Sequence, residues 1–208
     1  MVKVDYKKHE KTLYLPKTTP SLIEVPAMRF IAIDGEGDPN EEPFALATAA
    51  LYTLTYAVKM SYRSASPPEG YYEYTIYPLE GVWDLIDYSV PHTVKSNLKY
   101  TIMIRQPSFL TPELFERFRG EAMRKKPNPF LAGARLIDMA EGRCCQMMHL
   151  GSYDDEPVSF AAMEAYCEAN GWGRAALTHR EIYLSDPRKT APDKLKTVLR
   201  FPVAPADG

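Results

Sequence analysis

The sequence predicts an α+β fold in which a strand–helix–strand–strand module occurs twice. The expected strands and helices do not alternate regularly, which argues against a doubly wound sheet. Two such modules would build one pseudo-symmetric antiparallel sheet with helices on one face and a ligand cleft at the symmetry axis. The duplication is inferred from Gly35-x-Gly37-Asp38 with Phe44-Ala45, which recurs as Gly151-x-Tyr153-Asp154 with Phe160-Ala161. The offset is constant, since 151 − 35 and 160 − 44 are both 116. A chance match is the alternative.

Composition limits the class of protein. With 208 residues, 45 % of them hydrophobic, the chain can bury a core and is not disordered. Its 25 basic and 27 acidic residues argue against a nucleic-acid binder. No apolar run approaches the ~18 residues of a membrane span, and residues 1–16 contain no signal-peptide core. Three cysteines form no disulfide framework. We expect a soluble, cytoplasmic protein, monomeric or homodimeric, without nucleic-acid or membrane partners.

The first half of the chain should contain an extended, proline-punctuated arm over residues 1–28 and strands over 29–34, 71–77 and 99–105, with a turn at 78–81. Residues 44–60 form the strongest helix candidate, because no charge occurs between Phe44 and Val58. One stripe of this helix should lie on a sheet. The other, which carries Tyr52 and Tyr56, needs a pocket, a second helix or a partner chain.

The second half should begin with a helix from Pro112 to about Lys125, capped by Thr111. Residues 135–150 should form one or two strands, broken near Glu141-Gly142. A helix over 157–170 should stop at Gly171, before strands over 179–185 and 196–203. We therefore predict one domain over 1–208, made of an arm (1–28), a first module (29–107), a connecting helix (108–134) and a second module (135–205).

Familiar catalytic patterns are absent. Asn40 occupies the place of the third glycine in a dinucleotide fingerprint, and there is neither a Walker loop nor a G-x-S-x-G elbow. The histidines and cysteines do not have metal-ligand spacing. Cys144 and Cys145 should point to opposite faces of a strand, and neither is a convincing nucleophile. We expect no metal and no cofactor.

The most informative segment is the strand that begins at His179. Alternation places Ile182 on the core face and places His179, Glu181 and Tyr183 together on the other. A carboxylate among aromatic rings can bind a cation or activate a water, and burial would raise its pKa toward neutrality. A half-solvated sheet face is the alternative interpretation. Glu73 would hold the corresponding place in the first module.

The chain is also rich in aromatic residues. These could pack in the core with their polar ends in contact with water, or they could line a flat cavity for planar or cationic ligands. Those near the expected modules are Tyr52, Tyr56, Tyr72, Tyr74, Tyr77, Trp83, Tyr153 and Tyr183.

Three segments resemble the stand-alone GyrI-like proteins: Tyr77-Pro78-Leu79-Glu80-Gly81-Val82-Trp83, Met103-Ile104-Arg105-Gln106-Pro107, and the run from His179 to Pro187. The similarity extends from about Tyr14 to Val203. The resemblance implies a duplicated module fold and small-molecule binding. The subgroup resembles cyclopropanoid cyclopropyl hydrolases, which open the strained ring of DNA-alkylating compounds of the yatakemycin and CC-1065 type inside an aromatic cage.

This resemblance implies a role in xenobiotic detoxification, with Glu181 activating a water. Tyr153 or Tyr183 would stabilise the developing phenolate. Stacking residues would be Trp83, Tyr52, Tyr56, Tyr77 and Tyr183. Two alternatives remain open. The protein could bind lipophilic or cationic compounds without catalysis, or it could be a partner-binding module whose uncharged helix is the interface.

Overall fold

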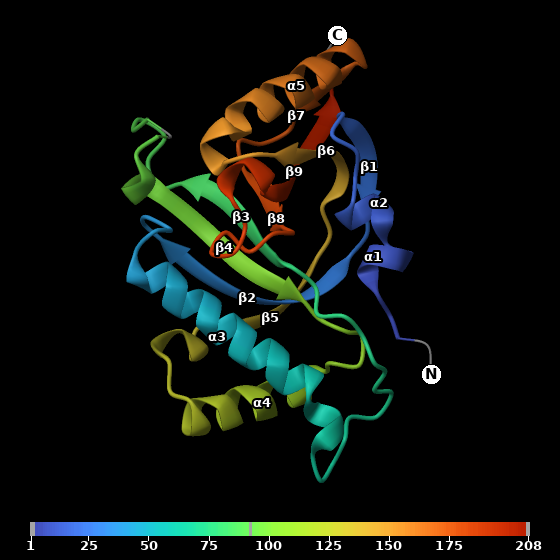
Figure 1. Cartoon of the computed structure of the whole chain (residues 1–208), viewed down its shortest axis with the longest axis vertical. Helices are drawn as coiled ribbons and strands as arrows, with labels where there is room; N and C mark the ends of the chain where they lie inside the picture. Colours follow the sequence, from blue (N-terminus) through green and yellow to red (C-terminus); the bar gives the residue numbers. More distant parts are fainter. Residues whose placement is uncertain (1–2, 92, 207–208) are drawn as a thin grey trace. The chain divides into compact units, whose positions relative to one another are not determined.

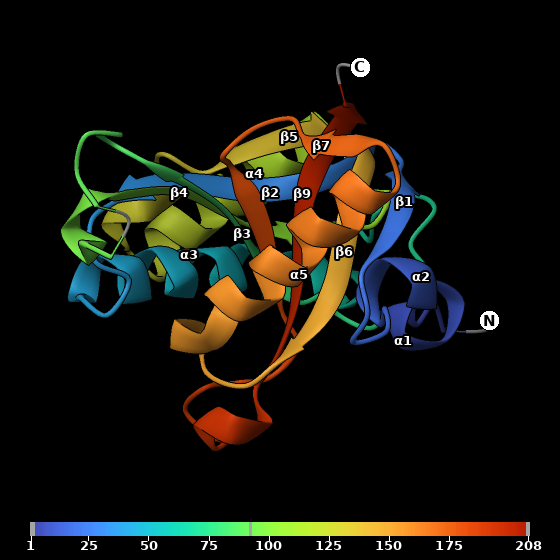
Figure 2. The same cartoon turned by 90° about the horizontal axis from the view of Figure 1, so that it is seen from above.

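The computed structural model describes residues 3–91 and 93–206. The chain forms two compact units, shown in Figure 1 and, turned by 90°, in Figure 2. The first contains residues 3–5, 28–77 and 84–139, and the second contains residues 6–27, 78–83 and 140–206. Among the described residues, no helix is both long and apolar enough to cross a membrane.

The first unit is built on a three-stranded antiparallel sheet. Its strands are β2 (Met28–Glu36), β4 (Leu98–Arg105) and β5 (Arg135–Met139), with β2 between the other two. Ile31 of β2 lies opposite Ile104 of β4 and Leu136 of β5. Ile31 and Ile104 are fully buried, so this sheet forms one side of the unit's hydrophobic core.

Helices cover that sheet. α3 (Glu42–Lys59) packs on β2 and β4, and α4 (Pro112–Lys125) packs on α3 (Figure 1). Leu51, Leu54 and Val58 are 0 % exposed, which confirms the buried stripe predicted for α3. Tyr56, on its other stripe, is 55 % exposed. The cap predicted for α4 is also confirmed, because Thr111 accepts a hydrogen bond from the Leu114 backbone N–H. Single turns of 3₁₀ helix lie at Ser61–Arg63, Lys95–Asn97 and Pro129–Leu131.

The second unit has its own antiparallel sheet. In spatial order its strands are β1 (Ser21–Val25), β6 (Gly142–Leu150), β9 (Lys196–Pro205), β8 (His179–Tyr183) and residues 79–83 of β3 (Leu79–Leu85), and β7 (Trp172–Arg174) also pairs with β9. Every strand pair described within the two units is antiparallel, which confirms the α+β class. The module duplication and the domain boundaries remain predictions.

The two faces of this second sheet are covered differently. Helix α5 (Glu156–Ala169) packs on one face across β6 and β9 (Figure 2). On the opposite face, the carbonyl oxygens of Thr12 and Leu13 accept hydrogen bonds from Gln146 of β6 and Arg200 of β9. The core beneath α5 consists of Cys145, Met147, Met163, Cys167, Leu199, Phe201 and Val203.

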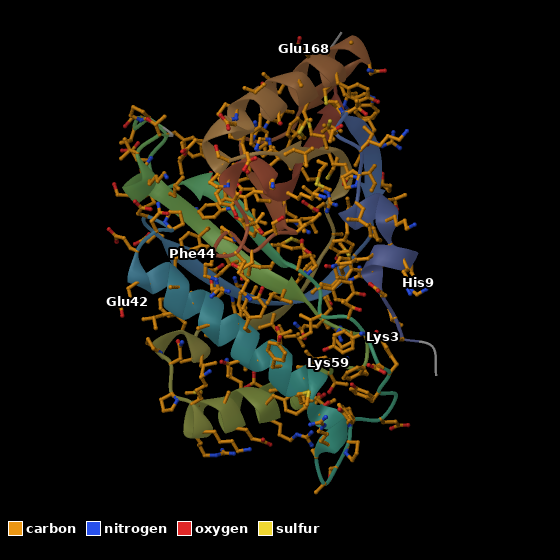
Figure 3. The ribbon with its side chains drawn as sticks, viewed as in Figure 1. Lys3, His9, Glu42, Phe44, Lys59 and Glu168 are labelled. Atoms are coloured by element: carbon orange, nitrogen blue, oxygen red, sulfur yellow. The ribbon has the colours of Figure 1, made fainter. Side chains whose placement is uncertain are left out.

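Two expectations about local structure are wrong. Residues 71–77 form no strand beyond an isolated bridge between Val4 and Tyr74. That segment is held instead by ring contacts with Phe109 and by Lys59 (labelled in Figure 3), whose Nζ lies 4.7 Å from the centroid of the Tyr74 ring. The strand begins at Leu79, within the predicted turn. Aromatic residues are common in strands, which is why a strand was predicted here. In the structure, contacts between the aromatic rings stabilise this segment without a neighbouring strand.

The second wrong expectation is the extended arm. Residues 6–9 and 11–14 form single helical turns, α1 (Tyr6–His9) and α2 (Lys11–Tyr14), and β1 follows as an edge strand on β6. Tyr6 and Tyr14 pack ring to ring at 5.0 Å and are buried. Burying these rings favours compact turns over the extended backbone that the prolines predicted.

Candidate functional site

The candidate site centres on Glu181 of β8. Its side chain is on the α5 face of the second unit's sheet, because Glu181 lies opposite Leu199, a residue of the core beneath α5, and the residue is only 9 % exposed. The Tyr183 hydroxyl donates a hydrogen bond of 2.7 Å to Glu181 Oε2, and His179 Nε2 lies 3.1 Å from Oε1. The grouping of these three residues on one face, predicted from strand alternation, is therefore confirmed.

A second layer holds Tyr183 in place. Trp83 of β3 donates from Nε1 to the Tyr183 hydroxyl at 2.8 Å, so an indole, a phenol and a carboxylate form a chain. Gly81 lies opposite Glu181 in the strand register. A Cβ at Gly81 would come within 2.7 Å of Trp83 Nε1 and 3.2 Å of the Tyr183 oxygen. Burial and the Glu181 charge raise the pKa of Tyr183 well above its ordinary value, so its phenol remains a donor.

Glu156, the first residue of α5, is part of the site and was missed by the sequence reasoning. It is 6 % exposed, and its carboxyl group lies within hydrogen-bonding reach of the Glu181 carboxyl group. Burial, and after it the Glu181 charge, raises the pKa of Glu156 to about 10. An acidic residue at a helix start is a common solvent-exposed feature, so only the contact with a second carboxyl could have revealed it.

Tyr153 lies beside this pair, in the 3₁₀ turn Tyr153–Asp155 that precedes α5. Its ring is edge-on to the Tyr183 ring at 6.0 Å, and it is 38 % exposed. Burial, followed by the charge of Glu181, raises the pKa of Tyr153 to about 12. Among the predicted site residues, the structure thus brings Glu181, Tyr153, Tyr183 and Trp83 together in one unit.

The buried His149 holds the turn that contains Tyr153 in place through hydrogen bonds. His149 of β6 contacts Ser159 Oγ through Nδ1 and the Ser152 carbonyl oxygen through Nε2, each at 2.9 Å. Because a carbonyl can only accept, Nε2 donates to Ser152. Gly151 between these groups has φ +134°, a conformation that favours glycine.

The remaining predicted binding residues belong to the first unit. Tyr52 and Tyr56 are neighbours on α3, with ring centroids 6.5 Å apart. Tyr77 is 6 % exposed and lies under the Arg105 guanidinium, 4.6 Å from the ring centroid. Glu73, the predicted counterpart of Glu181, is exposed and lies outside any strand.

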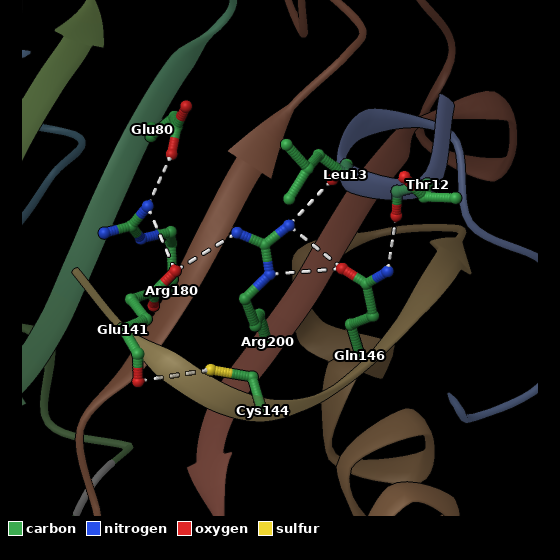
Figure 4. A network of polar contacts seen from close by, with 8 residues as sticks. All are labelled: Thr12, Leu13, Glu80, Glu141, Cys144, Gln146, Arg180 and Arg200. Carbon is green, nitrogen blue, oxygen red and sulfur yellow. Dashed lines mark hydrogen bonds and ion pairs between the residues drawn. The ribbon is translucent and has the colours of Figure 1, made fainter. Parts of the chain in front are cut away.

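The sheet face opposite Glu181 carries a buried polar network (Figure 4). Arg180 contacts Glu80 and Glu141 at 3.1 Å each, and Arg200 contacts Glu141 at 3.1 Å. Arg200 also donates to Gln146 at 2.9 Å and to the Leu13 carbonyl at 2.7 Å. Two guanidinium groups therefore face two carboxylates, and this balance lets charges remain in a buried layer.

Cys144 and Cys145 are buried on opposite faces, as predicted, and burial raises the pKa of the Cys144 thiol to about 12. Such thiols are protonated and poor nucleophiles at neutral pH. Within residues 3–91 and 93–206, no three His, Cys, Asp or Glu side chains are grouped so as to hold a metal ion.

A mixed α/β domain with a buried carboxylate among aromatic side chains has the features of a small-molecule-binding protein. The family model described as the GyrI-like small molecule binding domain matches residues 18–204. The chain belongs to this family.

Solved structures from Listeria innocua are similar over nearly the whole chain. One, described as an uncharacterized conserved protein, is 39 % identical with a TM-score of 0.91, over 97 % of this chain and 100 % of that one. Another, described as a hydrolase, is 38 % identical with a TM-score of 0.89 over the same shares of the two chains. The C-terminal domain of EcmrR, 13 % identical with a TM-score of 0.57 over 90 % of this chain and 98 % of that one, shares the fold alone. No curated protein matches.

Proposed function

We propose that the protein binds flat polycyclic compounds beside Glu181 and hydrolyses an activated cyclopropane in them, as found in yatakemycin- and CC-1065-type alkylating agents. The observation that carries the proposal is the Glu181 carboxylate, which is buried among aromatic residues and held by hydrogen bonds from Tyr183 and His179. Hydrolase-described structures at 38 % identity support the reaction class.

In this reaction, Glu181 takes a proton from a water whose oxygen attacks the less hindered cyclopropane carbon. The ring C–C bond breaks, and its electron pair moves onto the conjugated carbonyl, which becomes a phenolate. The proton then passes to the phenolate oxygen, so the product is the substrate plus one water. Ring strain already activates the substrate, and general-base catalysis of roughly 10²–10⁴-fold would suffice.

Two tyrosines have different roles in this mechanism. The Tyr183 hydroxyl donates to Glu181 and accepts from Trp83, so it is committed to orienting the base. Tyr153 is more exposed, and its pKa of about 12 keeps its phenol protonated at neutral pH. We assign Tyr153 as the donor to the developing phenolate. Trp83, 6 % exposed, supports Tyr183. Stacking of the substrate on Tyr52, Tyr56 and Tyr77 remains a prediction.

Mass spectrometry tests the proposal. A cyclopropane-containing duocarmycin-class compound is incubated with wild type, with Glu181→Gln, and with Glu73→Gln as the matched control at an exposed glutamate. Wild type and Glu73→Gln should yield a product heavier by one water. Glu181→Gln should bind the compound and leave it unchanged. Turnover by Glu181→Gln at the wild-type rate, with normal binding, would rule out the role of Glu181.

The second candidate function is sequestration of lipophilic cations without catalysis, favoured by the same buried carboxylate and by the small-molecule-binding description of the family. Under this alternative, unchanged compound co-purifies with wild type, and Glu181→Gln loses affinity for cationic ligands while keeping affinity for neutral ones. Concentration-dependent dimerisation without ligand binding would instead favour a partner-binding module.

A further inference from the structure

We propose that Glu156 is the proton-carrying partner of Glu181. Its neutral carboxyl group donates a hydrogen bond to the Glu181 carboxylate and holds it in place as the base. This inference rests on the proposed function of Glu181. It adds Glu156, on helix α5, as a residue that positions Glu181 on strand β8.

Glu156 and Glu181 are both shielded from water. Glu156 at the start of α5 and Glu181 on β8 are 6 % and 9 % exposed, and their carboxyl groups lie within hydrogen-bonding reach of each other. A hydrogen bond between two carboxyl groups needs a proton on one of them. Two adjacent carboxylates shielded from water would also repel each other strongly. The pair therefore holds one proton and one negative charge.

The hydrogen-bond partners of the two carboxyl groups decide which of them carries the proton. Glu181 has the Tyr183 hydroxyl and the His179 ring nitrogen as further neighbours, and hydrogen bonds to a carboxylate favour its charged form. Glu156 Oε1, by contrast, is buried and has no hydrogen-bond partner within the described part of the chain. An unpartnered oxygen is far less costly on a neutral carboxyl than on a carboxylate. The proton therefore belongs to Glu156.

The surrounding charges support this assignment. The charges that act most strongly on Glu156, those of Glu181 and Asp154, are negative, and with burial they raise its pKa to about 10. The amide groups at the start of α5 favour an anion, but the pKa of Glu156 is nevertheless raised. The titratable groups around this end of α5 are Glu181, Tyr183 and His179 on β8, Tyr153, Asp154 and Asp155 in the preceding turn, and His149 on β6. Arg174 of β7 pairs with Glu164 instead.

Three variants on α5 test the role of Glu156. Glu156→Gln keeps an N–H donor for Glu181 but cannot ionise. Glu156→Leu has similar size and no donor. Glu168→Gln is the matched control, because Glu168 is exposed at the other end of the helix (Figure 3). At neutral pH, Glu156→Gln and Glu168→Gln should turn over substrate within a few-fold of wild type. Glu156→Leu should lose about 10- to 100-fold in kcat, since Glu181 loses a donor.

The pH profile separates a proton-carrying residue from a packing residue. Wild-type activity should fall as pH approaches the pKa of about 10 at which Glu156 ionises and a second negative charge faces Glu181. This fall should be absent in Glu156→Gln. Wild-type activity in Glu156→Leu, or a complete loss in Glu156→Gln at every pH, would overturn the proposal.

An infrared measurement tests the protonation state without substrate. At about pH 8, above the ordinary carboxyl pKa, wild type should show a protonated-carboxyl C=O band that disappears in Glu156→Gln and persists in Glu168→Gln. Absence of this band in wild type overturns the inference whatever the enzyme does. A band that is present, combined with turnover that does not need Glu181, overturns the proposed function and leaves Glu156 as a buried neutral acid.

Discussion

Arg180 and Glu181 are consecutive residues of β8 whose side chains lie on opposite faces of the second unit's sheet. Arg180 is 1 % exposed and belongs to the buried ionic network, whereas Glu181 faces α5 and accepts a hydrogen bond from Tyr183. Fixing Arg180 on one face therefore fixes the strand position from which Glu181 projects on the other. A network that looks purely structural thereby contributes to the geometry of the candidate site.

Replacing Arg180 should destabilise the protein strongly. Arg180→Met leaves Glu80, which is 0 % exposed, without the guanidinium that lies 3.1 Å away. Breaking a buried ion pair in this way typically costs about 3–5 kcal/mol of unfolding free energy. Urea unfolding should show this loss, while Arg124→Met, at an exposed position of α4, should change stability by less than about 0.5 kcal/mol. Equal stability of the two variants would contradict the prediction.

Adding one methyl group at Gly81 should disturb the site. The new Cβ would lie 2.7 Å from Trp83 Nε1, so the indole must move and its bond to Tyr183 is lost. We expect Gly81→Ala to cost about 1–3 kcal/mol and to change the near-ultraviolet circular dichroism of Trp83. Gly173→Ala in β7 is the matched control, because a Cβ there meets nothing within 4 Å. Unchanged Trp83 signals in Gly81→Ala would refute the packing argument.

Removing the Tyr183 hydroxyl should impair catalysis more than folding. Tyr183→Phe deprives Glu181 of a 2.7 Å donor and Trp83 of its acceptor, which should cost about 1–3 kcal/mol, or roughly 10- to 100-fold in kcat/KM. Steady-state hydrolysis kinetics would measure this loss. Tyr166→Phe, at a half-buried tyrosine of α5 packed on the core, serves as the comparison. Similar kinetics for the two variants would remove Tyr183 from the mechanism.

The neutral Glu156 should also give stability a pH dependence. Its pKa is about 10 in the folded protein, above the ordinary 4.5, so the folded state keeps a proton that the unfolded state releases. Stability conferred by this group is therefore greatest below the unfolded pKa and declines as pH rises toward the folded one. Between about pH 6 and pH 9, Tm should fall more steeply in wild type than in Glu156→Gln. Parallel Tm curves would show that Glu156 carries no proton.

The three cysteines should be unreactive in the folded protein. Cys144, Cys145 and Cys167 are all buried, and burial raises the pKa of Cys144 to about 12. A thiol reagent such as dithionitrobenzoate should label none of them in native buffer and all three after denaturation. Rapid native labelling of any one would indicate local opening of the second unit.

Elements with strong local signals were predictable from the sequence. Thr111 before Pro112 predicted the start of α4, and Glu141-Gly142 predicted the break between β5 and β6. These signals involve neighbouring residues and backbone geometry, so they act without the rest of the fold. The strand over 71–77 failed for the opposite reason. A strand requires a neighbouring strand for its backbone hydrogen bonds, and residues 71–77 are stabilised by ring contacts instead.

The sequence by itself determined the α+β class, the main helices, and the face of β8 on which His179, Glu181 and Tyr183 lie together. Periodicity is enough for these features, because a strand alternates its side chains wherever it is placed. Only the tertiary structure decided that Glu156 belongs to the site and that Trp83, predicted as a stacking residue, donates a hydrogen bond to Tyr183. The pairing of β3 with β8, in which Trp83 lies opposite His179, lets the Trp83 indole reach the Tyr183 hydroxyl, and Glu156 meets Glu181 through the packing of α5. Such contacts depend on long-range chain placement, and they set the burial and charge that make Glu156 a neutral acid.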